Sequence, residues 1–295
     1  MRKIAVFAVV LLAASTAYAT AGDVVIVVGP SGSQIGFPSP GGVAGTWSSD
    51  GHLKQVPVFG TNAAFDARSH LFTVDSFLTE RDDTYAIVRK TSLPEPGIAL
   101  VADGLGGAYV LGASGTMYFY DASGTLQRQF PIDGVVIANA SRIRLDFDGA
   151  CTLAYHDPGT LLAGGFSIAR FDVCAMQTLS SLGDGKPYDS FRLMQDGFVA
   201  ARGSTLLFHD GQSRLVQSRT LPVATVGGTI PALAFGAELG SIWIAVDTHA
   251  ENRRLSDGVL LATLPGGPPV VGIAVNGERR PSLLDRIGRR RSTRH

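Results

Sequence analysis

The sequence predicts an all-β protein, a six-bladed β-propeller whose N- and C-terminal strands share one blade. Short β-branched and aromatic runs alternate with Gly-containing turns along the chain. The turns recur at intervals of 37 to 48 residues, which matches the period of a propeller blade. Several strands are apolar on consecutive residues, as expected where both faces of a sheet are covered. A ring of seven blades stays open as an alternative.

The clearest repeat spans residues 98–132 and is expected to form four short strands. We place these strands at Ile98–Ala102, Ala108–Gly112, Met117–Asp121 and Leu126–Ile132. The turns between them contain Asp103-Gly104, Gly115-Thr116 and Ser123-Gly124. Glycine adopts positive φ without steric cost and aspartate tolerates it, so such dipeptides favour tight turns. The unit is therefore interpreted as one antiparallel blade.

Further copies of this pattern occupy 62–96, 142–182, 190–222 and 231–265, the first of them loosely. In each of the five copies, a polar residue lies in the turn after the first strand. A strand-like run near the C-terminus resembles one more first strand and is also followed by a polar residue. These residues are Asp66, Asp103, Asp148, Asp196, Glu238 and Asn276. No segment shows a 3.6-residue apolar period, which argues against a helical repeat. We therefore expect one propeller domain over residues 20–277.

The two ends of this domain are expected to complete each other. Val270–Asn276 resembles one more first strand, but the chain after it is too short for three others. Residues 23–60 hold strand-like runs without a first strand. Pairing the C-terminal strand with the N-terminal ones would complete a sixth blade and remove two unpaired sheet edges.

The chain contains two cysteines, Cys151 and Cys174. If the hairpin in the 142–182 copy centres between Leu162 and Ala163, the two cysteines face each other across its second and third strands. Facing Cβ atoms lie about 4.5–5.5 Å apart, which is close enough for a disulfide. The alternative is a pair of buried free thiols.

The first 19 residues have the pattern of a secretory signal peptide. Arg2 and Lys3 precede an apolar run, Ile4–Ala14, and Ala17-Tyr18-Ala19 supplies the small-x-small cleavage pattern. A transmembrane anchor is the alternative, but eleven apolar residues rise only roughly 16 Å as a helix, about half of a bilayer core. We expect cleavage after Ala19 and an exported protein, in the periplasm or outside the cell.

The overall net charge of zero conceals an asymmetry. Residues 278–295 hold seven Arg against two acidic residues, whereas 20–277 hold 16 basic and 23 acidic residues. The acidic body argues against nucleic-acid binding through a phosphate footprint. The basic segment 278–295 is expected to be a disordered tail that is either solvated or in contact with an anionic surface.

Two motifs within the clearest repeat resemble those of the NHL, SMP-30/gluconolactonase and TolB-like group of six-bladed propellers. One is the D-G-x-x-x-x-Y-V run at Asp103–Val110, and the other is the Y-D-x-x-G-x-L run at Tyr120–Leu126. The resemblance covers most of 62–277 at the level of architecture. Members of this group include enzymes, binding modules and cell-envelope proteins, so the fold alone does not select a function.

Resemblance to the SMP-30-like enzymes implies a divalent cation such as Ca²⁺ at one mouth of the central channel. The residues just before three first strands are Glu95, Asn139 and Asp189, whose oxygens suit a hard cation. The other blades offer Asn62, Thr229 and Pro269 at these places, so the ring is incomplete. The alternative is that these polar residues are solvated or cap turns.

The sequence lacks H-E-x-x-H, C-x-x-C, G-x-S-x-G and a complete phosphate-binding loop. We therefore assign no catalytic residues. The sequence leaves open whether the protein is an enzyme and favours the hypothesis that it is not. The favoured hypothesis is an exported, non-catalytic propeller that binds a protein or glycan or serves as a scaffold. The alternative is a metal-dependent lactonase- or esterase-like hydrolase with its cation at the channel mouth.

Overall fold

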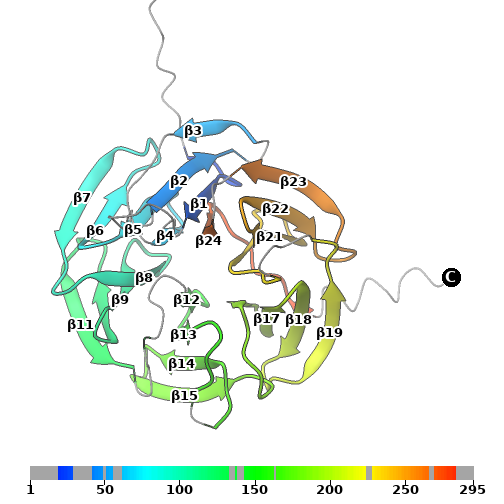
Figure 1. The fold of residues 1–295 in the computed structure, drawn as a ribbon. Coiled ribbons are helices and arrows are strands. Elements are labelled where there is room, and N and C mark those ends of the chain that lie inside the picture. The colour runs from blue at the N-terminus through cyan, green and yellow to red at the C-terminus, as the bar shows by residue number, and fades with distance from the viewer. Residues whose placement is uncertain are drawn as a thin grey trace, which may run out of the picture.

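The protein forms a ring of six four-stranded antiparallel sheets around a central axis (Figure 1). The computed structural model describes residues 19–28, 42–48, 51–55, 62–132, 137, 143–162, 164–223, 228–265 and 269–283. The six-bladed all-β prediction is confirmed, and seven blades are excluded. The predicted leader, apart from Ala19, and residues 284–295 of the predicted tail lie outside the described residues.

Five blades are continuous in sequence, and each is named here after its innermost strand. The β4 blade holds β4 (Asn62–Phe65), β5 (Leu71–Val74), β6 (Phe77–Arg81) and β7 (Ile87–Ser92). The β8 blade holds β8 (Gly97–Ala102), β9 (Ala108–Gly112), β10 (Thr116–Tyr120) and β11 (Leu126–Pro131). The β12 blade holds β12 (Arg144–Phe147), β13 (Thr152–His156), β14 (Ile168–Asp172) and β15 (Gln177–Leu182).

The last two continuous blades follow the same order. The β16 blade holds β16 (Ser190–Leu193), β17 (Gly197–Arg202), β18 (Thr205–Asp210) and β19 (Leu215–Thr220). The β20 blade holds β20 (Leu233–Phe235), β21 (Ser241–Val246), β22 (His249–Arg254) and β23 (Leu260–Pro265). All five blades coincide with the repeats expected from the sequence.

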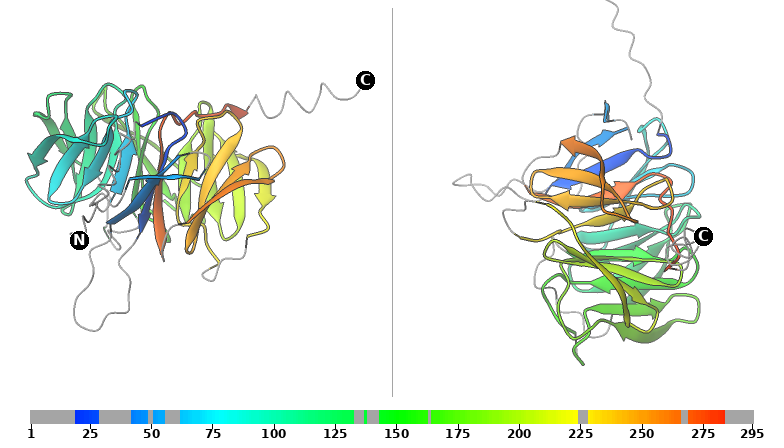
Figure 2. Two further views of the ribbon diagram at one scale, coloured as in Figure 1. Left: turned by 90° about the horizontal axis from the view of Figure 1, so that it is seen from above. Right: turned by 90° about the vertical axis from the view of Figure 1, so that its right-hand side faces the viewer.

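The sixth blade, called the closing blade, combines both ends of the described chain (Figures 1 and 2). It contains β1 (Val24–Val28), β2 (Gly42–Trp47), β3 (Leu53–Gln55) and β24 (Val270–Val275). Its innermost strand, β24, pairs antiparallel with β1, from Val24 opposite Val275 to Val28 opposite Val270. The predicted closure is confirmed, because backbone hydrogen bonds join the two ends of the ring.

The hydrophobic core lies between the blades. Six buried clusters each join two neighbouring blades, and together they account for all six blade interfaces. In one of them, Trp243 of the β20 blade packs with Trp47 and Ile26 of the closing blade. The middle strand β21 packs against a neighbouring blade on each face, which explains why it is buried at all six residues instead of alternating.

Aspartates order the turns between strands. Asp103 Oδ1 accepts hydrogen bonds from the backbone N–H groups of Leu105 and Gly107, and Asp121 Oδ1 does the same for Ser123 and Thr125. The hydrogen bond from the Ser123 hydroxyl is the largest of the effects that lower the pKa of Asp121, to about 2. The recurrent Asp of the repeat is thus a turn-forming residue.

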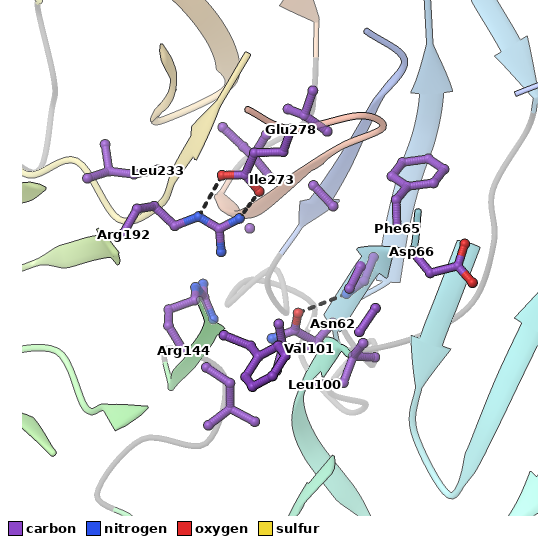
Figure 3. A pocket seen from close by; sticks show the side chains of 18 of the residues that line it. Asn62, Phe65, Asp66, Leu100, Val101, Arg144, Arg192, Leu233, Ile273 and Glu278 are labelled. Atoms are coloured by element: carbon purple, nitrogen blue, oxygen red, sulfur yellow. Dashed lines mark hydrogen bonds and ion pairs between the residues drawn. The ribbon is translucent and has the colours of Figure 1, made fainter. Parts of the chain in front are cut away.

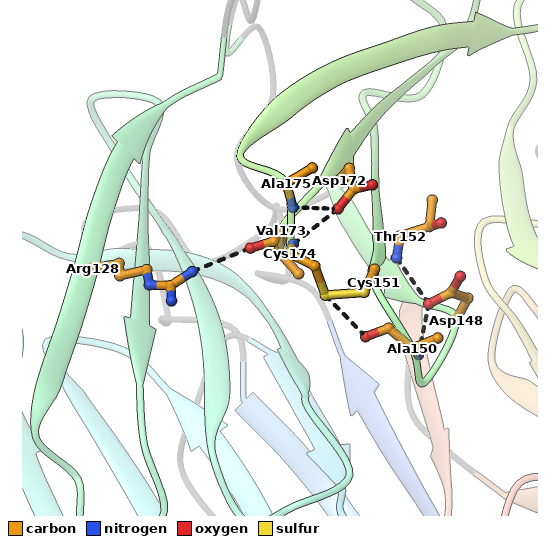
Figure 4. The surroundings of a disulfide bond; sticks show 9 residues. All are labelled: Arg128, Asp148, Ala150, Cys151, Thr152, Asp172, Val173, Cys174 and Ala175. Carbon is orange, nitrogen blue, oxygen red and sulfur yellow. Dashed lines mark hydrogen bonds between the residues drawn. A yellow bond between two sulfur atoms is a disulfide. The ribbon is translucent and has the colours of Figure 1, made fainter.

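The predicted disulfide joins Cys151 to Cys174, with Cα atoms 5.4 Å apart (Figure 4). The register differs by one residue from the expected one. Thr152 pairs with Asp172, so Val173 lies opposite Cys151 and its N–H donates to the Cys151 carbonyl at 2.9 Å. Cys174 reaches its partner diagonally from the turn after β14.

Candidate functional site

The six innermost strands surround a cavity of about 240 Å³ on the propeller axis (Figure 3). Its lining combines apolar residues, in segments such as Ala63–Ala64 and Gly272–Ala274, with a comparable share of polar surface. Its charged and amide-bearing lining residues are Asn62, Asp66, Asp103, Arg144, Arg192, Glu278 and Arg280. Charged groups inside inner strands are costly to bury unless partners hold them, and the structure supplies those partners.

Asp146 of β12 is the centre of an ion-pair network beside this cavity. Its side chain is fully buried. Oδ1 and Oδ2 accept hydrogen bonds from Arg280 at 2.6 and 3.0 Å, and Oδ2 also accepts one from the Leu193 N–H at 2.6 Å. Arg192 Nη1 lies 3.2 Å from Oδ1. Burial opposes the charged carboxylate, but the guanidinium groups of Arg192 and Arg280 outweigh it and hold the pKa of Asp146 below its usual value.

Arg280 belongs to a segment after the final strand, residues 276–283, which we call the C-terminal strap. Arg280 also donates to the carbonyls of Leu193 at 2.8 Å and Phe147 at 2.6 Å. Earlier in the strap, Arg279 N–H donates to the Gly236 carbonyl at 3.1 Å. The strap therefore starts in the closing blade, contacts the β20 blade and reaches the ends of β12 and β16.

The end of the strap is fixed to the β16–β17 turn. Asp196 accepts hydrogen bonds from the Ser282 hydroxyl at 2.6 Å and from the Leu283 N–H at 2.7 Å. The Leu283 side chain is buried in the cluster between the β16 and β20 blades. The first six residues of the predicted basic tail are thus packed on the propeller, and Arg280 points inward to a buried carboxylate.

Glu278 brings the strap to the wall of the cavity. Its carboxylate pairs with Arg192, with Nε donating to Oε1 at 3.0 Å, and Oε1 also accepts the Phe235 N–H at 2.8 Å (Figure 3). Figure 3 shows Arg144 and Asn62 directed into the cavity and Asp66 turned away from it. Figure 3 thus shows the guanidinium groups of Arg144 and Arg192, the Glu278 carboxylate and the Asn62 amide around the cavity.

Several polar groups of this lining are held by other groups of the protein. Among the described residues around the cavity there is no His, Cys, Lys or Tyr side chain. Glu278 is paired with Arg192, and Asp103 accepts backbone hydrogen bonds. The hydroxyl of Ser190 donates to the Ile230 carbonyl at 2.6 Å.

Two of the residues predicted to hold a cation, Glu95 and Asp189, have partners within the protein. Glu95 accepts hydrogen bonds from the Ser114 hydroxyl at 2.5 Å, the Tyr118 hydroxyl at 2.8 Å and the Ser114 N–H at 2.6 Å. Burial opposes its charge, but these donors, the Ser114 hydroxyl first, hold the pKa of Glu95 below its usual value. Asp189 accepts the Gly203 N–H at 2.7 Å. Neither residue lines the axial cavity, and Asn139 lies outside the described residues, so the cation site stays a prediction.

One group of described side chains has the spacing of a metal site, namely Cys151, Asp172 and Cys174. The two sulfur atoms are bonded to each other in the disulfide, and Asp172 accepts the N–H groups of Cys174 and Ala175 at 2.9 and 2.8 Å (Figure 4). A disulfide sulfur is not a thiolate ligand. The spacing of this cluster is therefore explained by a disulfide-linked turn that Asp172 orders.

Sequence reasoning missed the network of Asp146, Arg192, Glu278 and Arg280. A signal for it exists, because Arg144, Asp146 and Arg192 interrupt otherwise apolar inner strands. Glu278 and Arg280 follow the last inner strand directly. The first strands were expected to bring a site together where they begin, whereas this charged network gathers where they end.

No protein-family model matches the sequence, and no curated protein matches it either. Solved structures do resemble the fold. A protein of unknown function from Bacteroides caccae superimposes with a TM-score of 0.60 at 12% identity, covering 86% of this chain and 98% of that one. U3-55K gives 0.54 at 10% identity, covering 80% and 81%. The Neurospora crassa Pan2 WD40 domain gives 0.50 at 14% identity, covering 72% and 68%.

These identities support the propeller architecture alone. They do not select the NHL, SMP-30 and TolB-like group over other propellers. A β-propeller is compatible with a binding or scaffold module, and the choice of ligand has to come from the site.

Proposed function

We propose that the protein is an exported, non-catalytic binding module that accepts a polar group of a protein or glycan ligand in its axial cavity. The observation that carries this proposal is the composition of the cavity. Asn62, Arg144 and Arg192 present hydrogen-bonding groups among the apolar residues of the lining. Binding sites commonly combine an apolar wall with a few fixed polar groups.

The ion-pair network supports binding by fixing the cavity wall. Arg192 is held by Glu278 on one side and Asp146 on the other. A side chain held in this way loses little conformational freedom when a ligand arrives, so less of the binding free energy is lost to ordering. The strap contributes to this rigidity because Glu278 belongs to it.

Two further observations support export. The disulfide between Cys151 and Cys174 bonds a half-buried residue to an exposed one, and such bonds persist in oxidising compartments. The leader pattern in residues 1–19 adds the targeting signal.

The residues that the structure describes include no helix with the length and apolarity that a membrane crossing requires.

The test is to fill the cavity. Ala64→Trp places a large ring in the lining, and Ala175→Trp adds the same ring at an exposed turn as the matched control. Both variants and the parent are exposed to an oligosaccharide array and to a phage-displayed peptide library. We expect a ligand that binds the parent and Ala175→Trp but not Ala64→Trp. Equal binding by all three would place the site elsewhere, and Ca²⁺-dependent lactone hydrolysis would favour the hydrolase alternative.

A further inference from the structure

Asp23, at the start of β1, is a fully buried carboxylate surrounded by donors. Its Oδ2 accepts hydrogen bonds from the Thr20 backbone N–H at 2.8 Å, from Lys54 Nζ at 3.0 Å and from the Tyr85 hydroxyl at 3.0 Å. Its Oδ1 accepts the Thr20 hydroxyl at 3.0 Å. A buried carboxylate is retained when such donors offset its desolvation.

These donors come from separate parts of the ring closure. Lys54 lies on β3, the outermost strand of the closing blade, and Tyr85 lies in the β6–β7 turn of the β4 blade. The Asp23 carbonyl accepts the Asn276 N–H at 2.8 Å, just after β24. Burial, and next the Asp23 charge, raises the pKa of Tyr85, so its phenol stays protonated as a donor. Asp23 therefore ties both chain ends to the neighbouring blade.

Thr20 is also the residue that follows the predicted cleavage pattern Ala17-Tyr18-Ala19. In the uncleaved chain the nitrogen of Thr20 is a neutral amide with one hydrogen. Hydrolysis of the peptide bond between Ala19 and Thr20 adds water across it, leaving a carboxylate on Ala19 and an α-ammonium on Thr20. That ammonium carries one positive charge and three hydrogens at a nitrogen already 2.8 Å from Asp23 Oδ2.

We propose that Asp23 is a preformed receptor for the mature amino terminus generated by cleavage after Ala19. The inference rests on the proposed export of the protein. Before maturation the Thr20 amide donates a hydrogen bond to the Asp23 carboxylate, and only the acceptor of that bond is charged. After maturation the donor is charged as well, so a charge–charge attraction is added to the hydrogen bond. Removal of the leader thereby strengthens the contact between the closing blade and the β4 blade.

The experiment compares three forms of the protein by reversible urea denaturation. One begins at Thr20 with a free amine, one is the same chain with Thr20 acetylated, and one retains Ala19. We expect the folding equilibrium constant of the free Thr20 form to exceed those of both other forms by about tenfold, because only that form has a positive charge on the Thr20 nitrogen beside Asp23. Equal constants for the three forms would overturn the receptor, whatever compartment the protein occupies.

Two variants show whether Asp23 is responsible. Asp23→Asn should remove the difference between free and acetylated Thr20, whereas Tyr85→Phe keeps the carboxylate and should preserve it. If Asp23→Asn does not fold, the folding equilibrium constants of the free and acetylated Thr20 forms are compared at several pH values without this substitution. The difference between the two constants should be complete below about pH 7.7, the ordinary pKa of an α-amino group. It should shrink as the pH rises through the pKa of the bound ammonium. A difference that persists unchanged at about pH 11 would refute the assignment.

Amino-terminal sequencing of the protein from its natural source separates the two proposals. A chain beginning at Thr20 supports both of them. A chain beginning at Tyr18 or at another leader residue would leave export standing and overturn the receptor. An intact chain that begins at Met1 and is recovered inside the cell would overturn export, while the denaturation comparison would still decide whether Asp23 binds a free amine.

Discussion

Replacing Arg280 with alanine should measure how much the C-terminal strap contributes to the unfolding free energy of the propeller. Arg280 donates four hydrogen bonds, to both oxygens of Asp146 and to the carbonyls of Phe147 and Leu193. Breaking a buried ion pair by removing one partner costs about 3–5 kcal/mol. Arg192 still lies 3.2 Å from Asp146 in the variant, so we expect the lower end, about 3 kcal/mol.

The assay is reversible urea denaturation followed by the fluorescence of the buried Trp47 and Trp243. In thermal denaturation, a loss of about 3 kcal/mol of unfolding free energy lowers the melting temperature of a domain of this size by roughly 6 °C. Arg279→Ala is the matched control, because Arg279 is exposed and its substitution should stay within about 0.5 kcal/mol. Equal destabilisation by both variants would mean that the buried pair is not responsible.

The pH dependence of the same variant is a second check. The pKa of Asp146 is lowered in the folded protein, so its stabilising contribution is complete above the ordinary aspartate pKa of about 3.9. That contribution is lost as the pH falls through the lowered folded value. The difference in unfolding free energy between Arg280→Ala and the parent should therefore narrow in strong acid. A difference that stays constant down to about pH 2 would contradict the ion-pair explanation.

Four other outcomes are expected. Cys174→Ser opens a cross-link between residues 23 apart and should cost about 3 kcal/mol by denaturation under oxidising conditions. Burial lowers the pKa of His156 to about 3, so the unfolding free energy should fall as pH drops from about 6.5 to 3, and His156→Phe should flatten that dependence. Gly197→Ala would place a Cβ 2.1 Å from the His209 carbonyl oxygen and should cost at least about 1–3 kcal/mol, whereas Gly211→Ala, with its nearest atom at 3.8 Å, should not. Deleting 284–295 should abolish any salt-sensitive binding to anionic vesicles without lowering the melting temperature.

The blades could be predicted from the sequence because their signals are local. An Asp-Gly turn at Asp103-Gly104 depends on residues within one turn, and Gly104 does adopt a φ of 80°. The apolar run in β21 reports on both faces of a strand at once. Such patterns fix strand number and order without information from distant segments.

The register and the site depended on distant contacts. The disulfide partner was correct, but the pairing of β13 with β14 differs by one residue, because a long connection does not set register as a two-residue turn does. Arg280 meets Asp146 across 134 residues of sequence. No local pattern distinguishes Arg280 from the arginines that follow it. The sequence therefore predicts one solvated tail for the whole segment 278–295.

The composition of the closing blade constrains when this protein can fold. Its innermost strand, β24, leaves the ribosome only after the five continuous blades, whereas its partner β1 precedes all of them. Every core cluster spans two blades, so an emerging blade has no complete core of its own. The ring can therefore close only after β24 has emerged. A polypeptide built in this way stays open while its five continuous blades are synthesised and gains its stability when β24 pairs with β1.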